Sequence, residues 1–114
     1  MVVATTVALA HHRSFTTHSL YYADRYKGQT MACGGAYRPS KMVAAHRSLP
    51  CGTRLRVRNV ANDRVVRVTV RDRGPFGSKS WRRSHKLDVS KRAARRLGFL
   101  RAGSAKVRVT VLHD

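Results

Sequence analysis

Hydrophobic and polar positions alternate most clearly along residues 54–71. Leucine and valine alternate with arginine over residues 54–58, a polar stretch follows at 59–63, and valines then alternate with arginine and threonine. A period of two places successive side chains on opposite faces of a β-strand, so this segment predicts two half-buried strands joined as a hairpin. Residues 106–112 repeat the alternation and predict a further strand.

One short helix is predicted after Ser90. Ala93, Ala94 and Leu97 form an apolar stripe at helical spacing among lysines and arginines. Ser90 suits the N-cap position, and Gly98 suits the left-handed residue that follows the last turn. Short strands with a single short helix indicate a mainly β fold, a small barrel.

The chain ahead of the hairpin is less regular. Residues 19–22 form a short aromatic run that suits a strand, and residues 30–37 contain two glycines and favour a loop. A short apolar run follows at 42–45. A chain of 114 residues has room for one modest hydrophobic core, so we expect one domain.

The start of the chain is expected to be a leader. Residues 2–10 resemble a short secretory signal that ends in Ala-Leu-Ala, although no basic residue precedes them. A disordered leader or an extra strand is the alternative, and the run is too short to span a bilayer. We therefore expect a leader or degenerate signal segment at residues 1–18 and a barrel domain at 19–114.

The chain is strongly basic. Lysine and arginine number 24 against five acidic residues, all aspartate, and the net charge is +19. Such a charge favours anionic partners such as nucleic acid, anionic lipid or acidic polymers of the cell envelope. Nucleic acid is the less favoured of these, because no helix-turn-helix, zinc-finger or aromatic RNA-binding motif is present. A basic surface that serves only solubility is the alternative.

The two cysteines, Cys33 and Cys51, each precede a glycine. Their spacing is not that of a zinc ribbon or a CxxC redox motif, so a disulfide is the favoured prediction. In the chain-entropy model a loop of this size stabilises a domain by about 3 kcal/mol. A disulfide also requires an oxidising compartment, which favours a periplasmic or secreted protein associated with the cell envelope.

Four ordered motifs carry a resemblance to a known family. They read MVAAHRSLPCGT at 42–53, VRN at 57–59, VRDRGPF at 70–76 and LDVSKRAA at 87–94. On these motifs the chain resembles the RlpA (rare lipoprotein A) family. The resemblance implies a six-stranded double-psi β-barrel and endolytic cleavage of peptidoglycan glycan strands by lytic transglycosylation, with formation of an anhydro-sugar. Expansins share this barrel and imply the alternative, a non-catalytic polysaccharide-binding module that loosens the wall.

Asp72 is the expected catalytic residue. Lytic transglycosylation needs a group that protonates the glycosidic oxygen and then helps the sugar's own hydroxyl to attack, and one carboxyl group can serve both steps. The flanking Arg71 and Arg73 lower the pKa of a carboxyl group, so burial has to offset them. Without the resemblance, pairing with arginine or capping the turn at Gly74 is the better interpretation of Asp72. The resemblance also makes His46 a site residue that assists Asp72 or binds a sugar hydroxyl.

Further side chains are expected to contact the substrate. Asp88 precedes the predicted helix, where free backbone N–H groups stabilise a carboxylate, so a structural role is favoured there and substrate positioning is the alternative. Arg73, Tyr22 and Trp81 are the other candidates, and Trp81 is expected to be the most exposed aromatic side chain. We expect no metal or other cofactor, because the histidines near the start of the chain lack a matching carboxylate or cysteine pattern.

Gly35 departs from the family pattern. Members of the family typically read T-A-N-G-E where this chain has MACGG at residues 31–35, so glycine replaces the acidic residue implicated in activity. The chain contains no glutamate that replaces it. Either Asp72 suffices for cleavage, or the chain binds glycan without cutting it. In both cases the expected partners are peptidoglycan strands or another anionic wall polymer.

Overall fold

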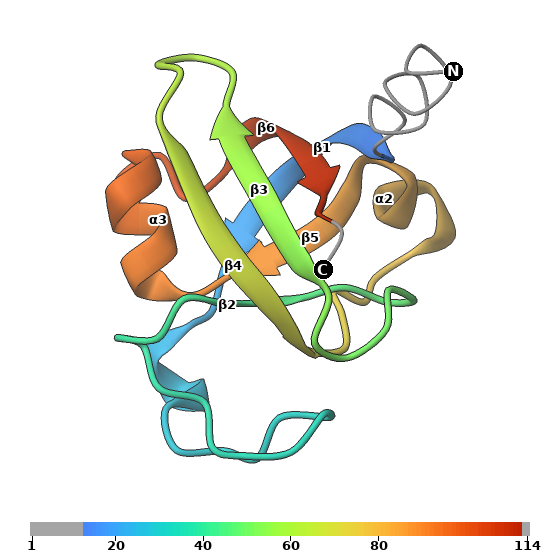
Figure 1. Cartoon of the computed structure of the whole chain (residues 1–114), viewed down its shortest axis with the longest axis vertical. Coiled ribbons are helices and arrows are strands. Elements are labelled where there is room, and N and C mark those ends of the chain that lie inside the picture. The colour runs from blue at the N-terminus through green and yellow to red at the C-terminus, as the bar shows by residue number, and fades with distance from the viewer. Residues whose placement is uncertain (1–12, 113–114) are drawn as a thin grey trace, which may run out of the picture.

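The computed structural model describes residues 13–112. Its strands are β1 (Ser14–Tyr21), β2 (Val43–Ala45), β3 (Arg54–Asn59), β4 (Val65–Asp72), β5 (His85–Val89) and β6 (Ala105–Val111). They close into a barrel in the order β1-β5-β2-β4-β3-β6 (Figure 1). Two neighbouring pairs, β1 with β5 and β2 with β4, are parallel, and the others are antiparallel. The six-stranded, mainly β barrel expected from the sequence is confirmed.

The hairpin of β3 and β4 follows the alternation in the sequence. Leu55 and Val57 are fully buried, and each lies opposite a valine of β4 in the barrel interior. The arginines between them face outward, where Arg56 lies opposite Arg67. One periodicity therefore produces both the core and part of the basic surface.

Two hydrophobic clusters hold the domain together. The larger one fills the barrel with aliphatic side chains and the apolar stripe of the predicted helix. The smaller one consists of Tyr22, Met31, Tyr37 and Ala45. This smaller cluster attaches the long connection between β1 and β2, which runs below the barrel in Figure 1, to the end of the barrel.

The predicted helix is confirmed as α3 (Lys91–Leu97). The Ser90 hydroxyl accepts a hydrogen bond from the N–H of Ala93 over 3.3 Å, and Gly98 ends the helix with a φ of 80°. The left-handed conformation of Gly98 explains why a glycine stands there.

The structure has a second α-helix that the sequence pattern did not indicate, α2 (Lys79–Ser84), and a short 3-10 helix, η1 (Asp24–Tyr26). None of the residues of α2 is fully buried, so the helix carries no apolar stripe that a periodicity would reveal. Its N-cap is Ser78, whose hydroxyl accepts from the N–H of Trp81. The prediction of one helix is therefore corrected to two α-helices in the described part of the chain.

β1 begins at Ser14, ahead of the strand predicted at residues 19–22. The expected boundary between residues 18 and 19 thus falls inside β1, which pairs with β6 over six residues, from Ser14 to Ser19. The signal segment expected at residues 2–10 lies outside the described residues. Across residues 13–112, no helix has the length and apolar character needed to cross a membrane.

Candidate active site

Asp72 and Asp88 lie on either side of Ala45 in one row across three strands. Ala45 of β2 pairs with Asp72 of β4 and with Asp88 of β5. Paired residues on neighbouring strands project from the same face of a sheet. Because neighbouring strands are about 4.8 Å apart, the two aspartates are separated by about 10 Å at their Cα atoms. The small side chain of Ala45 leaves space between the two carboxyl groups.

A bulge in β4 brings Asp72 into this row. Ala44 pairs with Val70, but the next residue, Ala45, pairs with Asp72, so Arg71 is the extra residue. Strict alternation would point Asp72 into the barrel together with Val70. The bulge turns Asp72 to the opposite face, as bulges near functional sites commonly do.

The row opens into a cleft of about 450 Å³ at the end of the barrel. Both carboxyl groups line the cleft, together with aromatic side chains from three segments, which include Tyr22, Tyr26, Phe76 and Trp81. Phe76 is 70% exposed and Tyr26 is 37% exposed. Carboxyl groups between exposed aromatic rings suit a carbohydrate, because sugar rings offer apolar faces along with hydroxyl groups.

The carboxylate of Asp72 accepts three hydrogen bonds. The hydroxyl of Tyr22 donates to Oδ2 over 2.7 Å, and the backbone N–H groups of Ala32 and Arg73 donate to Oδ1 over 2.8 and 2.9 Å. Both oxygens therefore have fixed partners, which orient the carboxyl group. Burial and the neighbouring Asp72 raise the pKa of the Tyr22 hydroxyl, so Tyr22 remains a donor.

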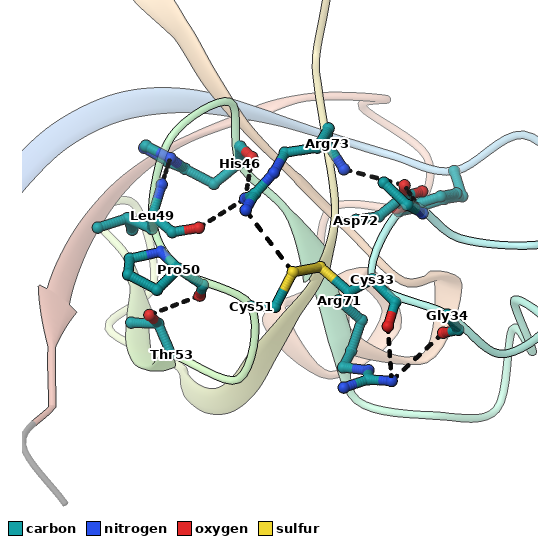
Figure 2. Close-up of a disulfide and its surroundings, with 12 residues drawn as sticks. Cys33, Gly34, His46, Leu49, Pro50, Cys51, Thr53, Arg71, Asp72 and Arg73 are labelled. Atoms are coloured by element: carbon teal, nitrogen blue, oxygen red, sulfur yellow. Dashed lines mark hydrogen bonds between the residues drawn. A yellow bond between two sulfur atoms is a disulfide. The ribbon is translucent and has the colours of Figure 1, made fainter.

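Arg73 is among the residues that line the cleft, and its guanidinium contacts the loop after β2 (Figure 2). Its guanidinium donates to the carbonyl oxygens of His46 and Leu49, and it lies 3.6 Å from Sγ of Cys51. The role in substrate binding expected for Arg73 stays a prediction, and the guanidinium that would serve it already holds the loop after β2. No ion pair joins Arg73 to Asp72 among residues 13–112.

Arg71 and the disulfide connect the same region from the other side (Figure 2). Cys33 and Cys51 form a disulfide, as predicted. Arg71 donates to the carbonyl oxygens of Cys33 and Gly34 over 3.4 and 3.3 Å. The disulfide and Arg71 thus hold Cys33 and Gly34 in place. The residue before them, Ala32, donates its backbone N–H to Asp72.

Asp88 has the opposite environment to Asp72. Its Oδ1 is buried and has no hydrogen-bond partner in the described structure. Burial, and then the negative charge of Asp72, raise the pKa of Asp88 to about 6. The contact with the start of α3 expected for Asp88 is not present, because Ser90 caps that helix. The cleft therefore combines one carboxyl group with a raised pKa and an unpartnered oxygen with one whose two oxygens are hydrogen-bonded.

The structure separates His46 from the two aspartates. Its Nδ1 accepts hydrogen bonds from the N–H groups of Ser48 and Leu49 over 3.1 and 3.0 Å. Burial, and then the positive charges of Arg47 and other basic residues, lower the pKa of His46 to about 4, so the ring is neutral near pH 7. The backbone N–H of His46 donates to the carbonyl oxygen of Asp72, but no side-chain hydrogen bond joins the two within residues 13–112.

Trp81 is half-buried, whereas the sequence led us to expect the most exposed aromatic residue there. Its ring stacks on His85 with centroids 4.3 Å apart and planes 5° from parallel. Gly77 makes this position possible, because a Cβ at residue 77 would lie 2.6 Å from Cε3 of Trp81. Sequence reasoning missed Gly77 and the backbone of Ala32 as contributors to the site. The only signal for Gly77 was the glycine itself after Gly74-Pro75-Phe76.

A metal is not suggested by the arrangement of donors. Within residues 13–112, no group of three or more histidine, cysteine or aspartate side chains is placed to hold a metal ion. A carboxyl group with a raised pKa and an unpartnered oxygen, across from one that is hydrogen-bonded, can take part in acid–base chemistry.

Residues 16–109 match a family model described as "Lytic transglycolase". The chain belongs to this family. Relatives named as endolytic peptidoglycan transglycosylase RlpA include one from Neisseria meningitidis, 37% identical over 94 residues, and one from Nostoc sp., named as probable, 47% identical over 89 residues. These matches cover 82% and 78% of this chain but 37% and 23% of the relatives, so the chain spans well under half of the family members it matches. The resemblance to the RlpA family inferred from the motifs is confirmed.

Two solved structures superpose on the barrel of this chain. The Streptomyces papain inhibitor superposes with a TM-score of 0.68 at 27% identity, covering 89% of this chain and 96% of the inhibitor. An expansin from Clavibacter michiganensis superposes with a TM-score of 0.67 at 27% identity, covering 90% of this chain and 52% of the expansin. The double-psi β-barrel expected from the sequence is confirmed.

Proposed function

We propose that this protein is an endolytic peptidoglycan transglycosylase that acts outside the cytoplasm. The observation that carries the proposal is the pair of unlike carboxyl groups in the cleft. Asp88 has an unpartnered, buried oxygen and a pKa of about 6. Asp72, on the other side of Ala45, accepts three hydrogen bonds. The RlpA relatives support the choice of reaction by their names, and the Cys33–Cys51 disulfide supports an oxidising compartment.

Asp88 is the general acid and base in this mechanism. Its protonated carboxyl group gives a proton to the glycosidic oxygen, the bond from the anomeric carbon to that oxygen breaks, and the departing sugar leaves as an alcohol. The sugar's own hydroxyl then bonds to the anomeric carbon, and its proton passes to the Asp88 carboxylate. The anhydro-sugar forms without water, and Asp88 ends the cycle protonated again.

Asp72 stabilises the charge that develops in this reaction. The sugar ring becomes positively charged as the glycosidic bond breaks, and a fixed carboxylate across the cleft lowers the energy of that state. Because Tyr22 and two backbone N–H groups hold Asp72 in place, its carboxylate does not need to reorient during the reaction. This assignment differs from the expectation from the sequence, in which Asp72 was the proton donor and Asp88 had a structural or substrate-positioning role.

Sugar units on either side of the cleaved bond are proposed to contact the aromatic side chains of the cleft. Phe76 and Tyr26 present exposed rings, and Trp81 is fixed by stacking on His85. These rings would stack against the apolar faces of sugar units. The contacts position the strand so that a glycosidic oxygen lies near Asp88.

Digestion of purified peptidoglycan tests the proposal. The wild-type protein is expected to release anhydro-muropeptides detectable by mass spectrometry. Asp88→Asn is expected to reduce their rate of formation by about 100-fold or more, which is the usual contribution of a general acid. Asp63→Asn is the matched control, because Asp63 lies on the exposed β3–β4 turn and pairs with Arg58. Full activity of Asp88→Asn would contradict the assigned mechanism, and no product from wild type would contradict the enzyme proposal.

The alternative is a non-catalytic, polysaccharide-binding module that loosens the wall. Gly35 favours it, since the family's acidic residue is missing at that position. A Cβ at Gly35 meets no atom within 4 Å, although the φ of 81° makes a side chain there strained. Under this alternative, the wild-type protein binds peptidoglycan without releasing product, and Gly35→Glu is the variant expected to gain cleavage.

A further inference from the structure

A second hollow lies apart from the cleft and has a volume of about 440 Å³. Arg13, Phe15, His46, Arg47 and Lys86 are among the residues that line it, and none of its lining residues also lines the cleft. Among residues 13–112, no acidic side chain contributes to it. A concave site with only basic, neutral polar and aromatic groups is electrostatically suited to an anion.

His46 supplies a fixed hydrogen-bond donor to this hollow. Its Nδ1 accepts from the N–H groups of Ser48 and Leu49, so the proton of the neutral ring is on Nε2. Nε2 is therefore the ring nitrogen available to a ligand, and it acts as a donor. The ring of Phe15 lies 5.7 Å from that of His46 and forms an apolar part of the same wall.

The positive charges around the hollow differ in how they are held. Arg47 donates to the carbonyl oxygens of Pro75, Arg82 and His85, so its charge is fixed in position. Arg13 and Lys86 have no acidic partner among residues 13–112. Nζ of Lys86 lies 6.0 Å from the centroid of the Phe15 ring. Two cations without an acidic partner and one fixed cation thus line a hollow to which the described part of the chain contributes no acidic side chain.

We propose that this hollow binds a phosphate group of a wall polymer that carries repeated phosphodiesters. A phosphate group offers several acceptor oxygens, and it would receive hydrogen bonds from Nε2 of His46 and from the side chains of Arg13 and Lys86. The apolar carbons next to the phosphate would contact Phe15. This role accounts for His46, a half-buried histidine that the proposed chemistry in the cleft does not use.

Basic residues continue beyond the hollow in two directions, which favours a polymer over a single phosphate ion. On one side, a shallower depression shares Arg47 and Lys86 and adds Lys79, Arg82 and Arg83 from α2. On the other side, Arg108 of β6 donates to the hydroxyl of Ser14, which lines the hollow. Successive phosphates of one chain can therefore meet successive cations, whereas a free ion uses only the hollow.

Titration of the full chain with poly(glycerol phosphate) and with inorganic phosphate tests the proposal. The NMR signals of the His46 ring are expected to shift with both probes, and the pKa of His46 is expected to rise, because a bound anion offsets the charges of Arg13, Arg47, Arg73 and Lys86. The polymer is expected to bind at least 10-fold more tightly than phosphate, with an affinity that falls as salt rises. Unchanged His46 signals with both probes would overturn the proposal.

Charge-removing variants locate the site. Lys86→Gln and Arg13→Gln are each expected to weaken polymer binding about 5-fold or more, whereas Arg95→Gln on the exposed side of α3 serves as the matched control. Equal losses in all three variants would indicate a diffuse charge effect and overturn the proposal. Tighter binding to duplex DNA or to anionic phospholipid vesicles than to poly(glycerol phosphate) at the same salt would also overturn it.

The proposal rests on the proposed function only for the location at the cell wall. Asp88→Asn is expected to bind poly(glycerol phosphate) as the wild type does, and Lys86→Gln is expected to release anhydro-muropeptides at the wild-type rate. Polymer binding without glycan cleavage would contradict the proposed function alone. Cleavage without polymer binding would contradict the phosphate site alone.

Discussion

The hydroxyl of Tyr22 donates to Oδ2 of Asp72 over 2.7 Å, while its ring stacks on Tyr37 with centroids 4.2 Å apart. Tyr22 is the first residue of the β1–β2 connection, and Tyr37 lies nearer its end. The orientation of Asp72 therefore depends on how this long connection packs against the barrel.

Tyr22→Phe removes this hydrogen bond and keeps the stacked ring. We expect about a 10-fold loss of transglycosylase activity, because Oδ2 of Asp72 loses its partner and the carboxyl group is then held through Oδ1 alone, and a loss of about 1 kcal/mol in the free energy of unfolding. Rates of anhydro-muropeptide release and urea denaturation measure the two effects. Wild-type activity in Tyr22→Phe would show that the hydroxyl does not position Asp72.

Asp88→Asn is expected to change how stability depends on pH. The folded-state pKa of Asp88 is about 6, above the ordinary value of 3.8, so between these values the folded state binds more protons than the unfolded state. The contribution of Asp88 to the free energy of unfolding therefore falls as pH rises from 3.8 to 6 and stays low above pH 6. Relative to wild type, the variant should gain on the order of 2 kcal/mol between pH 4 and pH 7.

Urea denaturation of both proteins at pH 4 and pH 7 measures this gain, and comparing the two proteins cancels the titration of the other aspartates. A difference between wild type and Asp88→Asn that does not change with pH would show that Asp88 has an ordinary pKa. The same ionisation should appear in the activity of the wild type, which is expected to fall as pH rises above about 6, since Asp88 must be protonated to act as the acid.

His46 is expected to be important for stability rather than for glycan cleavage. His46→Leu leaves the N–H groups of Ser48 and Leu49 without an acceptor, which should cost about 1 to 3 kcal/mol. His46→Asn carries an oxygen that can take the place of Nδ1 and should cost less. Thermal unfolding ranks the two variants, and both should retain wild-type cleavage rates per folded molecule. A 100-fold loss of activity in folded His46→Asn would instead place His46 in the catalytic chemistry.

The Cys33–Cys51 disulfide is expected to stabilise both the domain and the position of Asp72. Replacing both cysteines with alanine removes a cross-link between positions separated by 18 residues, and we expect a loss of about 3 kcal/mol. Activity should fall as well, because Ala32 next to Cys33 donates to Asp72. Reduction of the wild-type protein with dithiothreitol should reproduce both effects. A double variant as stable and active as wild type would contradict them.

Gly77→Ala is expected to displace Trp81. The added Cβ would lie 2.6 Å from the indole ring, so the ring must move away from His85. The fluorescence of Trp81, the one tryptophan in the sequence, should change in intensity and wavelength. Gly103→Ala is the control, since it adds a Cβ with nothing within 4 Å and strains only the backbone. Identical spectra for Gly77→Ala and wild type would show that the indole ring does not depend on Gly77.

The sequence predicted the parts of this molecule that follow a regular period or a local rule. The valines of β4 and the capping residue Ser90 each stand in a pattern that has one structural interpretation. The disulfide followed from the absence of metal or redox spacing around Cys33 and Cys51.

The contents of the cleft followed less directly from the sequence, because they depend on long-range pairing. The bulge at Arg71 reverses the face of Asp72 without leaving a mark in the alternation. The raised pKa of Asp88 results from burial between strands that are distant in sequence. The neutral state of His46 results from burial and then from the positive charges that the fold places around it, and two backbone N–H groups that no pattern of side chains reveals fix its tautomer.

The row of Asp72, Ala45 and Asp88 also has a consequence for how the site forms during folding. β4 and β5 do not pair with each other, and the three residues of β2 are what holds the two carboxyl groups in register. Pairings of this kind join distant parts of the chain and form slowly. A proteolytic fragment that ends before β5 would contain Asp72 with all three of its donors but would have no proton donor opposite it.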